Sequence, residues 1–161
     1  EASNWEWDPV AEQYYLHRFL RHQPDLNYAN PLVQEAMLEV VDFWLERGVD
    51  GFRLDAVPFL FEEEGTRCEG LPDTHAFLQR LRARVDAGGR DVLLLGEAIQ
   101  PVQEAAPYLA ENELHGAFNF ALTAHLFAAV ASGSTRQLGA CLDEAEQAVQ
   151  GTALGPAASQ P

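Results

Sequence analysis

Lysine is absent from this chain of 161 residues, and all ten of its basic residues are arginine. Against them stand 25 acidic residues, which leaves a formal net charge of −15. Such an acidic balance argues against a general affinity for nucleic-acid phosphates or for anionic membrane surfaces. We therefore expect neither a nucleic acid nor a membrane among the partners of this protein.

Cysteine is also scarce, with only Cys68 and Cys141 in the sequence. Two cysteines are too few for a disulfide framework or for a structural zinc site, and we interpret both as reduced thiols. The sequence also lacks a signal-peptide pattern and any apolar run long enough to span a membrane. These absences favour a cytoplasmic protein.

Apolar residues are plentiful, at 47% of the chain, which argues against a disordered protein. The length fits one domain or a piece of one. The sequence begins at Glu1 without an initiator methionine, and we expect it to be the middle of a longer polypeptide.

Helix and strand signals alternate along most of the chain. Asn30 and Pro31 predict a helix start, because asparagine caps helices well and proline suits the first helical position. Residues 92–95 are apolar at consecutive positions, as in a parallel strand that is covered on both faces. We expect helices over 31–47, 74–87 (capped by Asp73 or Thr74), 101–110, 122–131 and 135–149, and strands over 49–57, 91–98 and 114–120.

The two ends of the chain differ from this alternating middle. Residues 1–30 combine aromatics with turn formers, and we interpret them as an ordered loop region with at most short strands. Residues 151–161 are mainly small residues with glycine and proline, typical of a linker or tail. Residues 31–150 alternate as right-handed βαβ units with a parallel sheet do. A (β/α)8 barrel takes about 250 residues, so the middle is either a small open α/β sheet or part of a barrel.

Ionisable side chains stand at the carboxyl ends of two predicted strands. Arg53 and Asp55 share one face of their strand, since side chains alternate, and Glu97 ends the next strand. One interpretation is structural, with Arg53 paired to Asp55 and Glu97 solvated. The other is catalytic, because parallel α/β folds build their sites at the carboxyl ends of strands. Two carboxylates there equip a glycosidase with a nucleophile and a general acid.

Three short motifs resemble those of the α-amylase family of glycoside hydrolases. Residues 50–57 read DGFRLDAV and resemble the family's fourth-strand motif, and residues 96–98 read GEA and resemble its fifth-strand motif. Residues 23–27 read QPDLN, which resembles a motif near the end of the loop domain inserted after strand three. Within the family, several runs between residues 4 and 28 and between residues 55 and 75 are similar to the trehalose synthases.

The resemblance implies that residues 31–150 are strands four to six of a (β/α)8 TIM barrel with their helices, after the end of an inserted loop domain in residues 1–30. The activity that it implies is retaining α-glucosyl transfer on maltose, an isomerisation to trehalose. A hydrolase of the α-glucosidase or α-amylase type stays open, as does a non-catalytic remnant. Residues 99–101 read IQP where we expect an Asn-Gln-Trp-like run, and Asn119 lies where we expect a histidine nearby, so the product stays open too.

The resemblance also implies a role for each motif residue. Asp55 is the expected nucleophile, which attacks the anomeric carbon of the sugar. Glu97 is the expected acid, which protonates the leaving oxygen and then acts as a base. Arg53 is expected to keep Asp55 ionised and oriented, since a nearby cation lowers the pKa of a carboxyl group. Gln23 is expected to contact sugar hydroxyls.

A calcium site follows from the same resemblance, and no organic cofactor does. Asp25 is the expected carboxylate ligand, with the backbone oxygens of Phe59 and Leu60 and the carboxylate of Glu62 as companions. Ligands that are all oxygen suit calcium. Surface charge is the alternative interpretation of Glu62.

Two motifs of the family have no counterpart in the sequence. These are the Asn-His-Asp motif of strand seven, which holds the third catalytic aspartate, and the strand-three motif with its sugar-binding histidine. We therefore expect the third catalytic aspartate to lie outside this chain and the isolated chain to be inactive. We also expect marginal stability, because helix faces that pack on missing neighbours are exposed.

Overall fold

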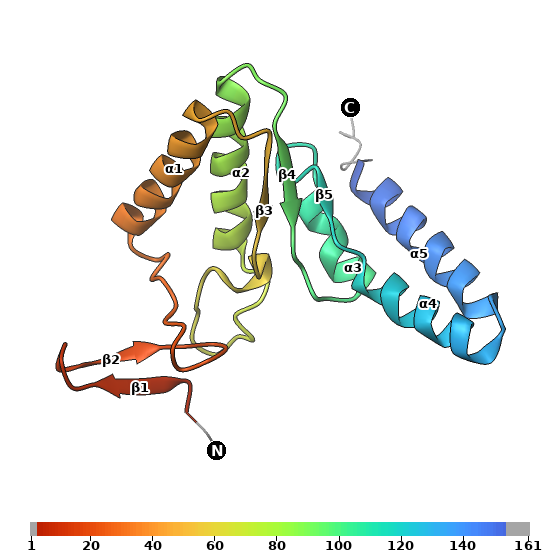
Figure 1. Ribbon diagram of the computed structural model, residues 1–161, viewed down its shortest axis with the longest axis horizontal. Coiled ribbons are helices and arrows are strands. Elements are labelled where there is room, and N and C mark those ends of the chain that lie inside the picture. The colour runs from red at the N-terminus through yellow and green to blue at the C-terminus, as the bar shows by residue number, and fades with distance from the viewer. Residues whose placement is uncertain (1–2, 154–161) are drawn as a thin grey trace, which may run out of the picture.

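A computed structural model describes residues 3–153 of the chain. Near the N-terminus, two strands form an antiparallel hairpin, β1 (Trp5–Asp8) and β2 (Gln13–Leu16). A second sheet is parallel and contains β3 (Gly51–Leu54), β4 (Leu93–Gly96) and β5 (Gly116–Ala117), side by side in that order (Figure 1).

Helices connect and flank the strands of the parallel sheet (Figure 1). The α-helices are α1 (Pro31–Glu46), α2 (Pro72–Ala87), α3 (Val102–Ala105), α4 (Phe120–Ser132) and α5 (Arg136–Ala153). There are also two short 3-10 helices, η1 (Val57–Phe59) after β3 and η2 (Ala106–Leu109) after α3. Within residues 3–153, no helix is both long enough and apolar enough to cross a membrane.

The start of α1 shows how local sequence sets an element. The side chain of Asn30 accepts a hydrogen bond from the Leu32 amide at 3.0 Å, and Pro31 is the first helical residue. After the helix, Gly48 adopts a φ of +89°, which residues with a side chain rarely adopt. Both ends of the predicted helix are therefore confirmed to within a residue.

The parallel sheet is built from crossover units, as the alternating sequence predicts. The register pairs Arg53 with Leu95 and Leu54 with Gly96, so β3 and β4 end beside each other. Helix α2 joins β3 to β4, and α3 with η2 joins β4 to β5. Parallel strands that are joined through helices in this way occur in open α/β sheets and in (β/α)8 barrels.

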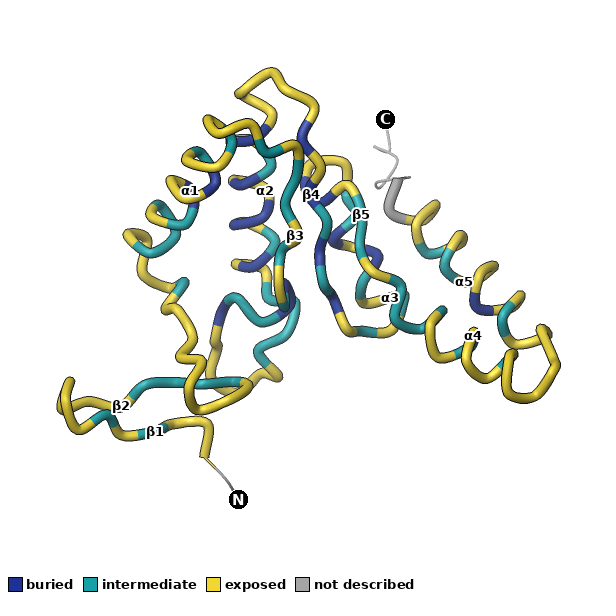
Figure 2. Tube along the Cα trace, viewed as in Figure 1, coloured by how far each residue is buried: buried dark blue, intermediate teal, exposed yellow. Residues whose placement is uncertain are grey.

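The core lies between the sheet and the helices α1 and α2 (Figure 2). Helix α2 contributes Leu78 and Val85, each 1% exposed, and β4 contributes Leu94, which has no exposed surface. Leu38 of α1 is 3% exposed and completes this side of the core. The helices are held on the sheet by apolar burial, the main stabilising contribution in a domain of this size.

The other face of the sheet is open within the described residues. Leu93 is 53% exposed, although its neighbour Leu94 is fully buried. The prediction that residues 92–95 are covered on both faces is therefore wrong, because alternate side chains point to opposite faces and only one face carries helices here.

Apolar side chains are also exposed on the outer helices. Helix α1 exposes Phe43 and Trp44, each at 46%, and α4 exposes Phe127 at 73% and Val130 at 79%. Exposed apolar surface of this extent is typical of faces that pack on another element. The marginal stability expected for the isolated chain stays a prediction.

Several predicted boundaries need correction. The parallel strands are shorter than predicted, and the predicted helix over 101–110 is divided into α3 and η2. Pro107 in η2 lacks an amide hydrogen and favours this break. The cap of α2 is Leu71, so Asp73 and Thr74 lie in the first turn. Helix α5 runs to Ala153, three residues into the predicted tail, and the remainder of that tail lies outside the described residues.

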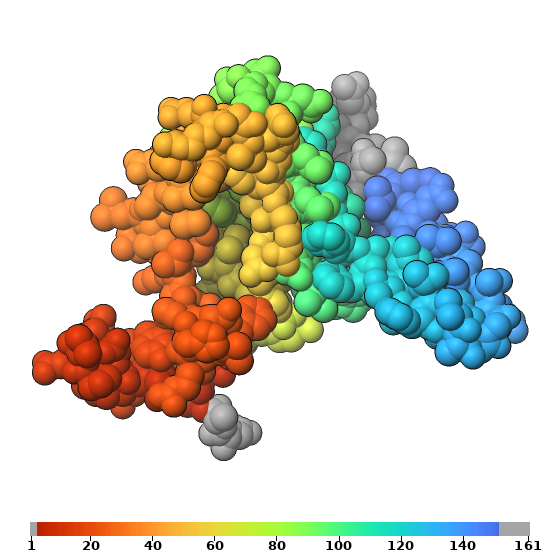
Figure 3. Space-filling view, viewed as in Figure 1, coloured from red at the N-terminus to blue at the C-terminus, as the bar shows by residue number. Residues whose placement is uncertain are grey.

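The N-terminal segment lies at the end of the sheet where β3 and β4 finish (Figure 1). In the space-filling view it forms a lobe beside those strand ends (Figure 3). The backbone is tied in place by hydrogen bonds such as that from the Asp25 amide to the Leu16 carbonyl at 2.9 Å. This arrangement brings the loop of residues 17–28 to the carboxyl ends of the parallel strands.

Candidate active site

The backbone after β3 turns sharply and leaves Asp55 at the strand end. Ala56 adopts the left-handed conformation, with φ 46° and ψ 41°, and the chain then enters η1. This conformation costs about 1 kcal/mol for a residue with a side chain, and such strain collects at functional sites. The side chain of Asp55, just before this turn, is 75% exposed.

Main-chain hydrogen bonds fix the ends of β3 and β4 relative to each other. The Glu97 amide donates to the Leu54 carbonyl at 2.9 Å, and the Val57 amide donates to the Glu97 carbonyl at 3.1 Å. These two bonds bracket Asp55 and Glu97. The positions of both carboxylates are therefore set by the sheet rather than by a flexible loop.

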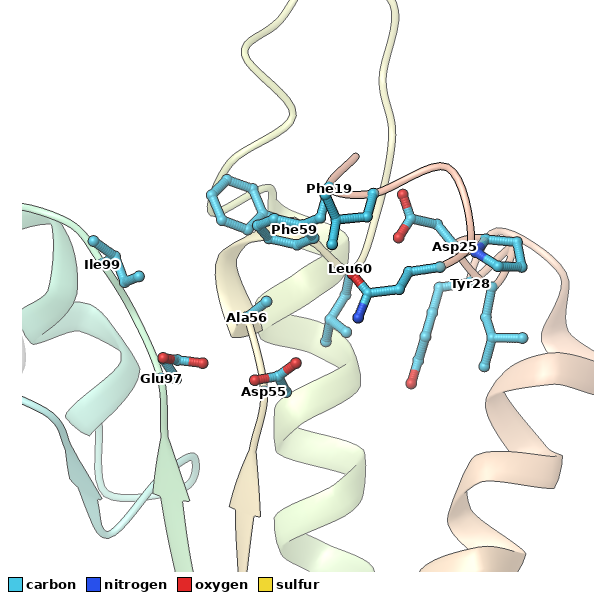
Figure 4. Close-up of a pocket in the computed structure, with 13 residues that line it drawn as sticks. Phe19, Asp25, Tyr28, Asp55, Ala56, Phe59, Leu60, Glu97 and Ile99 are labelled. Atoms are coloured by element: carbon cyan, nitrogen blue, oxygen red, sulfur yellow. The ribbon is translucent and has the colours of Figure 1, made fainter. Parts of the chain in front are cut away.

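Arg53 joins the two carboxylates. Its Nη1 lies 2.7 Å from Oδ1 of Asp55, and its Nη2 lies 2.5 Å from Oε2 of Glu97. The Glu97 side chain is 20% exposed, so it is not simply a solvated strand end. Figure 4 shows the two carboxyl groups side by side at adjacent strand ends. The structure thus brings all three residues together. The structural interpretation of the sequence had paired only Arg53 with Asp55 and had left Glu97 in solvent.

Hydrogen bonds to an ionised carboxylate favour its charged form. Hydrogen bonding with Glu97, and next with Arg53, lowers the pKa of Asp55 below its ordinary value of 3.8. Asp55 is therefore ionised at neutral pH, as a carboxylate nucleophile must be. Arg53 is the second of these causes, after Glu97.

A pocket of about 680 Å³ opens over the carboxylates (Figure 4). Asp55 and Glu97 lie on one side of it, and Gln23 of the N-terminal loop lies on its lining as well. The rest of the lining is Phe19, Leu20, Pro24, Asp25, Leu26, Tyr28, Ala56, Phe59, Leu60 and Ile99. Gln23 and the two carboxylates therefore line one pocket, and a molecule bound there can contact all three side chains.

The arrangement can perform a double displacement at a sugar carbon. An ionised carboxylate can attack the carbon, and a second carboxyl group on the next strand can give a proton to the leaving oxygen. Retaining enzymes hold these two groups about 5 to 5.5 Å apart. Contact of both groups with one guanidinium keeps them at short range.

The predicted calcium ligands also come together. Asp25, Phe59, Leu60 and Glu62 all line a second pocket of about 500 Å³. Arg18 lies among them: its amide donates to Oδ2 of Asp25 at 2.7 Å, and its Nη2 lies 3.0 and 3.1 Å from the two oxygens of Glu62.

The four ligand groups predicted in this second pocket are all oxygen donors, which suit calcium. Arg18 neutralises Glu62, so an ion that uses both carboxylates must take the place of that guanidinium. In the described part of the chain, no group of three or more histidine, cysteine, aspartate or glutamate side chains is placed to hold a metal ion.

Sequence reasoning missed some of the pocket lining. Phe19, Tyr28 and Ile99 were not predicted as site residues, although each lines the pocket over the carboxylates. Ile99 had a signal, because it lies two positions after Glu97 at a strand end. Phe19 and Tyr28 belong to the aromatic N-terminal segment, which could equally form a lid over a site or a loop packed on a core, and only the folded loop brings them to the sheet.

Comparison with known proteins agrees with this site. The family model described as alpha amylase, catalytic domain, matches residues 1–152. The chain therefore belongs to the α-amylase family of glycoside hydrolases, and the resemblance of its motifs is confirmed.

Two individual proteins are similar to this chain over different lengths. The chain is 55% identical over 135 residues to the trehalose synthase/amylase TreS of Mycolicibacterium smegmatis, which covers 81% of the chain and 23% of that protein. It is 63% identical over 66 residues to a probable alpha-glucosidase of Rhizobium meliloti, which covers 41% of the chain and 12% of that protein.

A solved structure supports the fold. The α-amylase from H. orenii superposes with a TM-score of 0.80 at 26% identity, over 92% of this chain and 29% of the other. The prediction of a partial (β/α)8 barrel is confirmed by this likeness. The chain spans less than a third of each of these three proteins.

Proposed function

We propose that this chain supplies the nucleophile and the acid–base group of an enzyme that isomerises maltose to trehalose by retaining α-glucosyl transfer. The observation that carries the proposal is the contact of Arg53 with both Asp55 and Glu97 in a pocket that Gln23 also lines. The relative named trehalose synthase/amylase supports the choice of maltose and trehalose.

The first chemical step forms a covalent intermediate. A carboxylate oxygen of Asp55 attacks the anomeric carbon of the glucosyl unit, and the bond from that carbon to the glycosidic oxygen breaks. Glu97 gives its proton to that oxygen, so glucose is released and the glucosyl unit stays on Asp55 as a β-linked ester. Arg53 orients both carboxyl groups through its two contacts.

The second step transfers the glucosyl unit back to the released glucose. The glucose turns so that its anomeric hydroxyl attacks the glucosyl carbon, Glu97 takes the proton of that hydroxyl, and the carboxylate of Asp55 leaves. Phe19 and Phe59 pack edge to face, with ring centroids 6.0 Å apart, on the rim of the pocket. Apolar rings there help to exclude water, which favours transfer over hydrolysis.

The test uses the complete enzyme, that is, this chain joined to the remaining strands of its catalytic barrel. Incubation with maltose and separation of the sugars should yield trehalose, and Asp55→Ala should abolish it. Arg136→Gln is the control, because Arg136 lies on α5 away from the pocket and this change should leave the yield unaltered.

Hydrolysis of an α-glucoside is the second candidate. The identity of 63% to a probable alpha-glucosidase favours it, as does the Ile99 position, where the trehalose-synthase pattern leads us to expect a polar residue. In that case water attacks the intermediate in place of glucose. Formation of glucose without trehalose in the maltose experiment would support hydrolysis and contradict the isomerisation.

For the isolated chain of 161 residues, we propose that no significant activity remains. Asp55 and Glu97 are present, but the strand-three and strand-seven motifs of the family are not. Loss of one transition-state contact can cost about 10²- to 10³-fold in rate, and several contacts are lost together. An assay with an aryl α-glucoside should show only background, and turnover that disappears in Asp55→Ala would contradict this expectation.

The proposal extends to calcium and to location. Asp25, Glu62 and the carbonyl oxygens of Phe59 and Leu60 would hold the ion, which would link the N-terminal loop to the segment after β3. The ion would support the pocket wall and take no part in the reaction.

A cytoplasmic location fits the two free cysteines, since reduced thiols are typical of that compartment.

A further inference from the structure

The two faces of the β1–β2 hairpin differ in chemistry. Residues that lie directly opposite each other in an antiparallel pair have their side chains on the same face. The register pairs Glu6 with Tyr15 and Asp8 with Gln13, so one face carries mainly polar groups. The other face carries both tryptophans of β1. The apolar side chains of β1 are therefore kept apart from the polar face.

A pocket of about 350 Å³ includes residues of this polar face, and we call it the hairpin pocket. Its lining is Asp8, Ala11, Gln13, Tyr15, Arg21 and Pro24. Pro24 also lines the pocket over the carboxylates, so the loop of residues 21–24 separates the two pockets. Ligand pockets have volumes of roughly 300 to 1,000 Å³, and the hairpin pocket therefore suits one small molecule.

Hydrogen bonds fix the backbone around the hairpin pocket. Oδ1 of Asp8 accepts from the amides of Val10 and Ala11, at 2.8 and 3.2 Å. The hydroxyl of Tyr15 donates to the carbonyl oxygen of Arg21 at 2.7 Å, which ties the loop to the hairpin. The two parts of the lining are thus held together before any ligand binds, which lowers the cost of ordering them.

The charges at the hairpin pocket favour a neutral ligand. Nη2 of Arg21 lies 2.9 Å from Oε1 of Glu6, and the side chain of Arg21 is 71% exposed. With Asp8 the three side chains carry one net negative charge, which disfavours an anion such as phosphate. A metal cation is disfavoured as well, because Arg21 lies in the same lining and Oδ1 of Asp8 already accepts two hydrogen bonds.

A sugar ring matches the groups that remain. Each sugar hydroxyl can donate and accept a hydrogen bond, and the pocket offers an acceptor in Asp8, a donor in Arg21 and both in the amide of Gln13. Ala11 and Pro24 add apolar surface for the C–H groups of the ring.

We propose that the hairpin pocket is a binding site for a neutral sugar ring, such as a hexose, separate from the candidate active site. The site binds the sugar and makes or breaks no covalent bond. The proposal does not depend on the glucosyl transfer proposed above, because none of its polar groups takes part in that reaction.

The test is a titration of the complete enzyme with glucose, followed by NMR of carbon-13-labelled methyl groups. The methyl group of Ala11 lines the hairpin pocket and those of Val10 lie beside it, so their signals report this pocket. Val130, which is 79% exposed on α4, is a reference whose signals should not move. Inorganic phosphate is titrated in parallel as the anion.

We expect the signals of Val10 and Ala11 to shift in a saturable way, with a dissociation constant on the order of 1 to 10 mM. Arg21→Gln should weaken binding about fivefold, because it removes a charged donor. Asp8→Asn should weaken it by a similar factor, since it keeps an acceptor for the two amides but exchanges the other carboxylate oxygen for an amino group.

Glu12→Gln is the matched control, because Glu12 is an exposed acidic residue next to Gln13 that does not line the hairpin pocket. This change should leave the dissociation constant unaltered. A circular-dichroism melt shows that each variant is folded.

Three outcomes would overturn the proposal. The first is an absence of saturable shifts at Val10 and Ala11. The second is an unchanged dissociation constant in both Arg21→Gln and Asp8→Asn. The third is tighter binding of phosphate than of glucose at these signals, which would show an anion site in place of a sugar site.

Discussion

Replacement of Gly96 by alanine should destabilise the sheet next to the site. A Cβ atom built on Gly96 lies 2.4 Å from Cδ1 of Leu114 and 3.5 Å from Cγ2 of Val57. Carbon atoms in contact are normally about 3.5 to 4.0 Å apart, so the side chain of Leu114 must move by roughly 1 Å. Leu114 is 2% exposed and Val57 1% exposed, which leaves little room for that movement.

Overpacking of this kind costs about 1 to 3 kcal/mol. Replacement of glycine also restricts the unfolded chain, which offsets about 0.4 to 1 kcal/mol. We therefore expect Gly96→Ala to lower the free energy of unfolding by about 1 to 2 kcal/mol. Urea unfolding followed by circular dichroism measures this change in the 161-residue chain.

A second variant tests the reason for the loss. Leu114→Ala alone should cost about 2 to 5 kcal/mol, because it leaves a cavity. Together, Gly96→Ala and Leu114→Ala should cost at least about 1 kcal/mol less than the sum, since the new methyl group enters the vacated space. Gly139→Ala on α5 meets nothing within 4 Å and should stabilise the chain by about 0.5 to 1 kcal/mol. Wild-type stability in Gly96→Ala, or strictly additive losses in the double variant, would refute the packing argument.

Three further predictions concern charged groups. Arg53→Gln should raise the pKa of Asp55, because it removes a hydrogen bond that favours the carboxylate; a carbon-13 NMR titration of Asp55 measures it. Because the pKa of Asp55 is lowered in the folded state, its ionisation stabilises the fold at pH values above the ordinary pKa of 3.8, and this stabilisation is lost as the pH falls through the folded-state pKa. In Arg53→Gln the folded-state pKa is higher, so the loss is complete at a higher pH. Glu113→Ala should cost about 2 to 3 kcal/mol in urea unfolding, since Glu113 is 3% exposed and accepts hydrogen bonds from His75 and Gln79. Calcium should raise the melting temperature of the complete enzyme, and Asp25→Asn should remove that increase.

Matched controls separate these effects from general damage. Arg136→Gln should leave the pKa of Asp55 unchanged, and an unchanged value in Arg53→Gln as well would contradict the role of Arg53. Glu111→Ala changes an exposed glutamate two positions from Glu113 and should cost under about 0.5 kcal/mol. In Asp91→Asn, calcium should raise the melting temperature as it does in the unchanged enzyme. The same rise in Asp25→Asn would contradict the role of Asp25 as a calcium ligand.

The cluster of Arg53, Asp55 and Glu97 was largely predictable from sequence, because most of its geometry is local. Arg53 and Asp55 are two positions apart at one strand end, and alternation alone puts them on one face. Glu97 ends the next strand, and parallel strands joined by a helix usually lie near each other. The contact of Arg53 with Glu97, at 2.5 Å, is the step that the register of β3 and β4 decided.

Other features came only from the tertiary structure. The part-buried pair of His75 and Glu113 joins residues 38 positions apart, and the two are brought together by the packing of α2 against the segment before β5. Arg18 and Glu62 are 44 positions apart and meet among the predicted calcium ligands. The exposed state of Leu93 likewise depends on which face of the sheet carries helices.

The sequence by itself determined where helices and strands form and which carboxylates end the strands, because capping, periodicity and strand alternation act within a few residues. The tertiary structure decided which residues share a pocket, which charges are neutralised and which apolar side chains face solvent. Those properties depend on contacts between segments that are distant in the sequence. Such contacts form through burial of apolar surface, which is non-directional, so local sequence patterns do not specify which segments will meet.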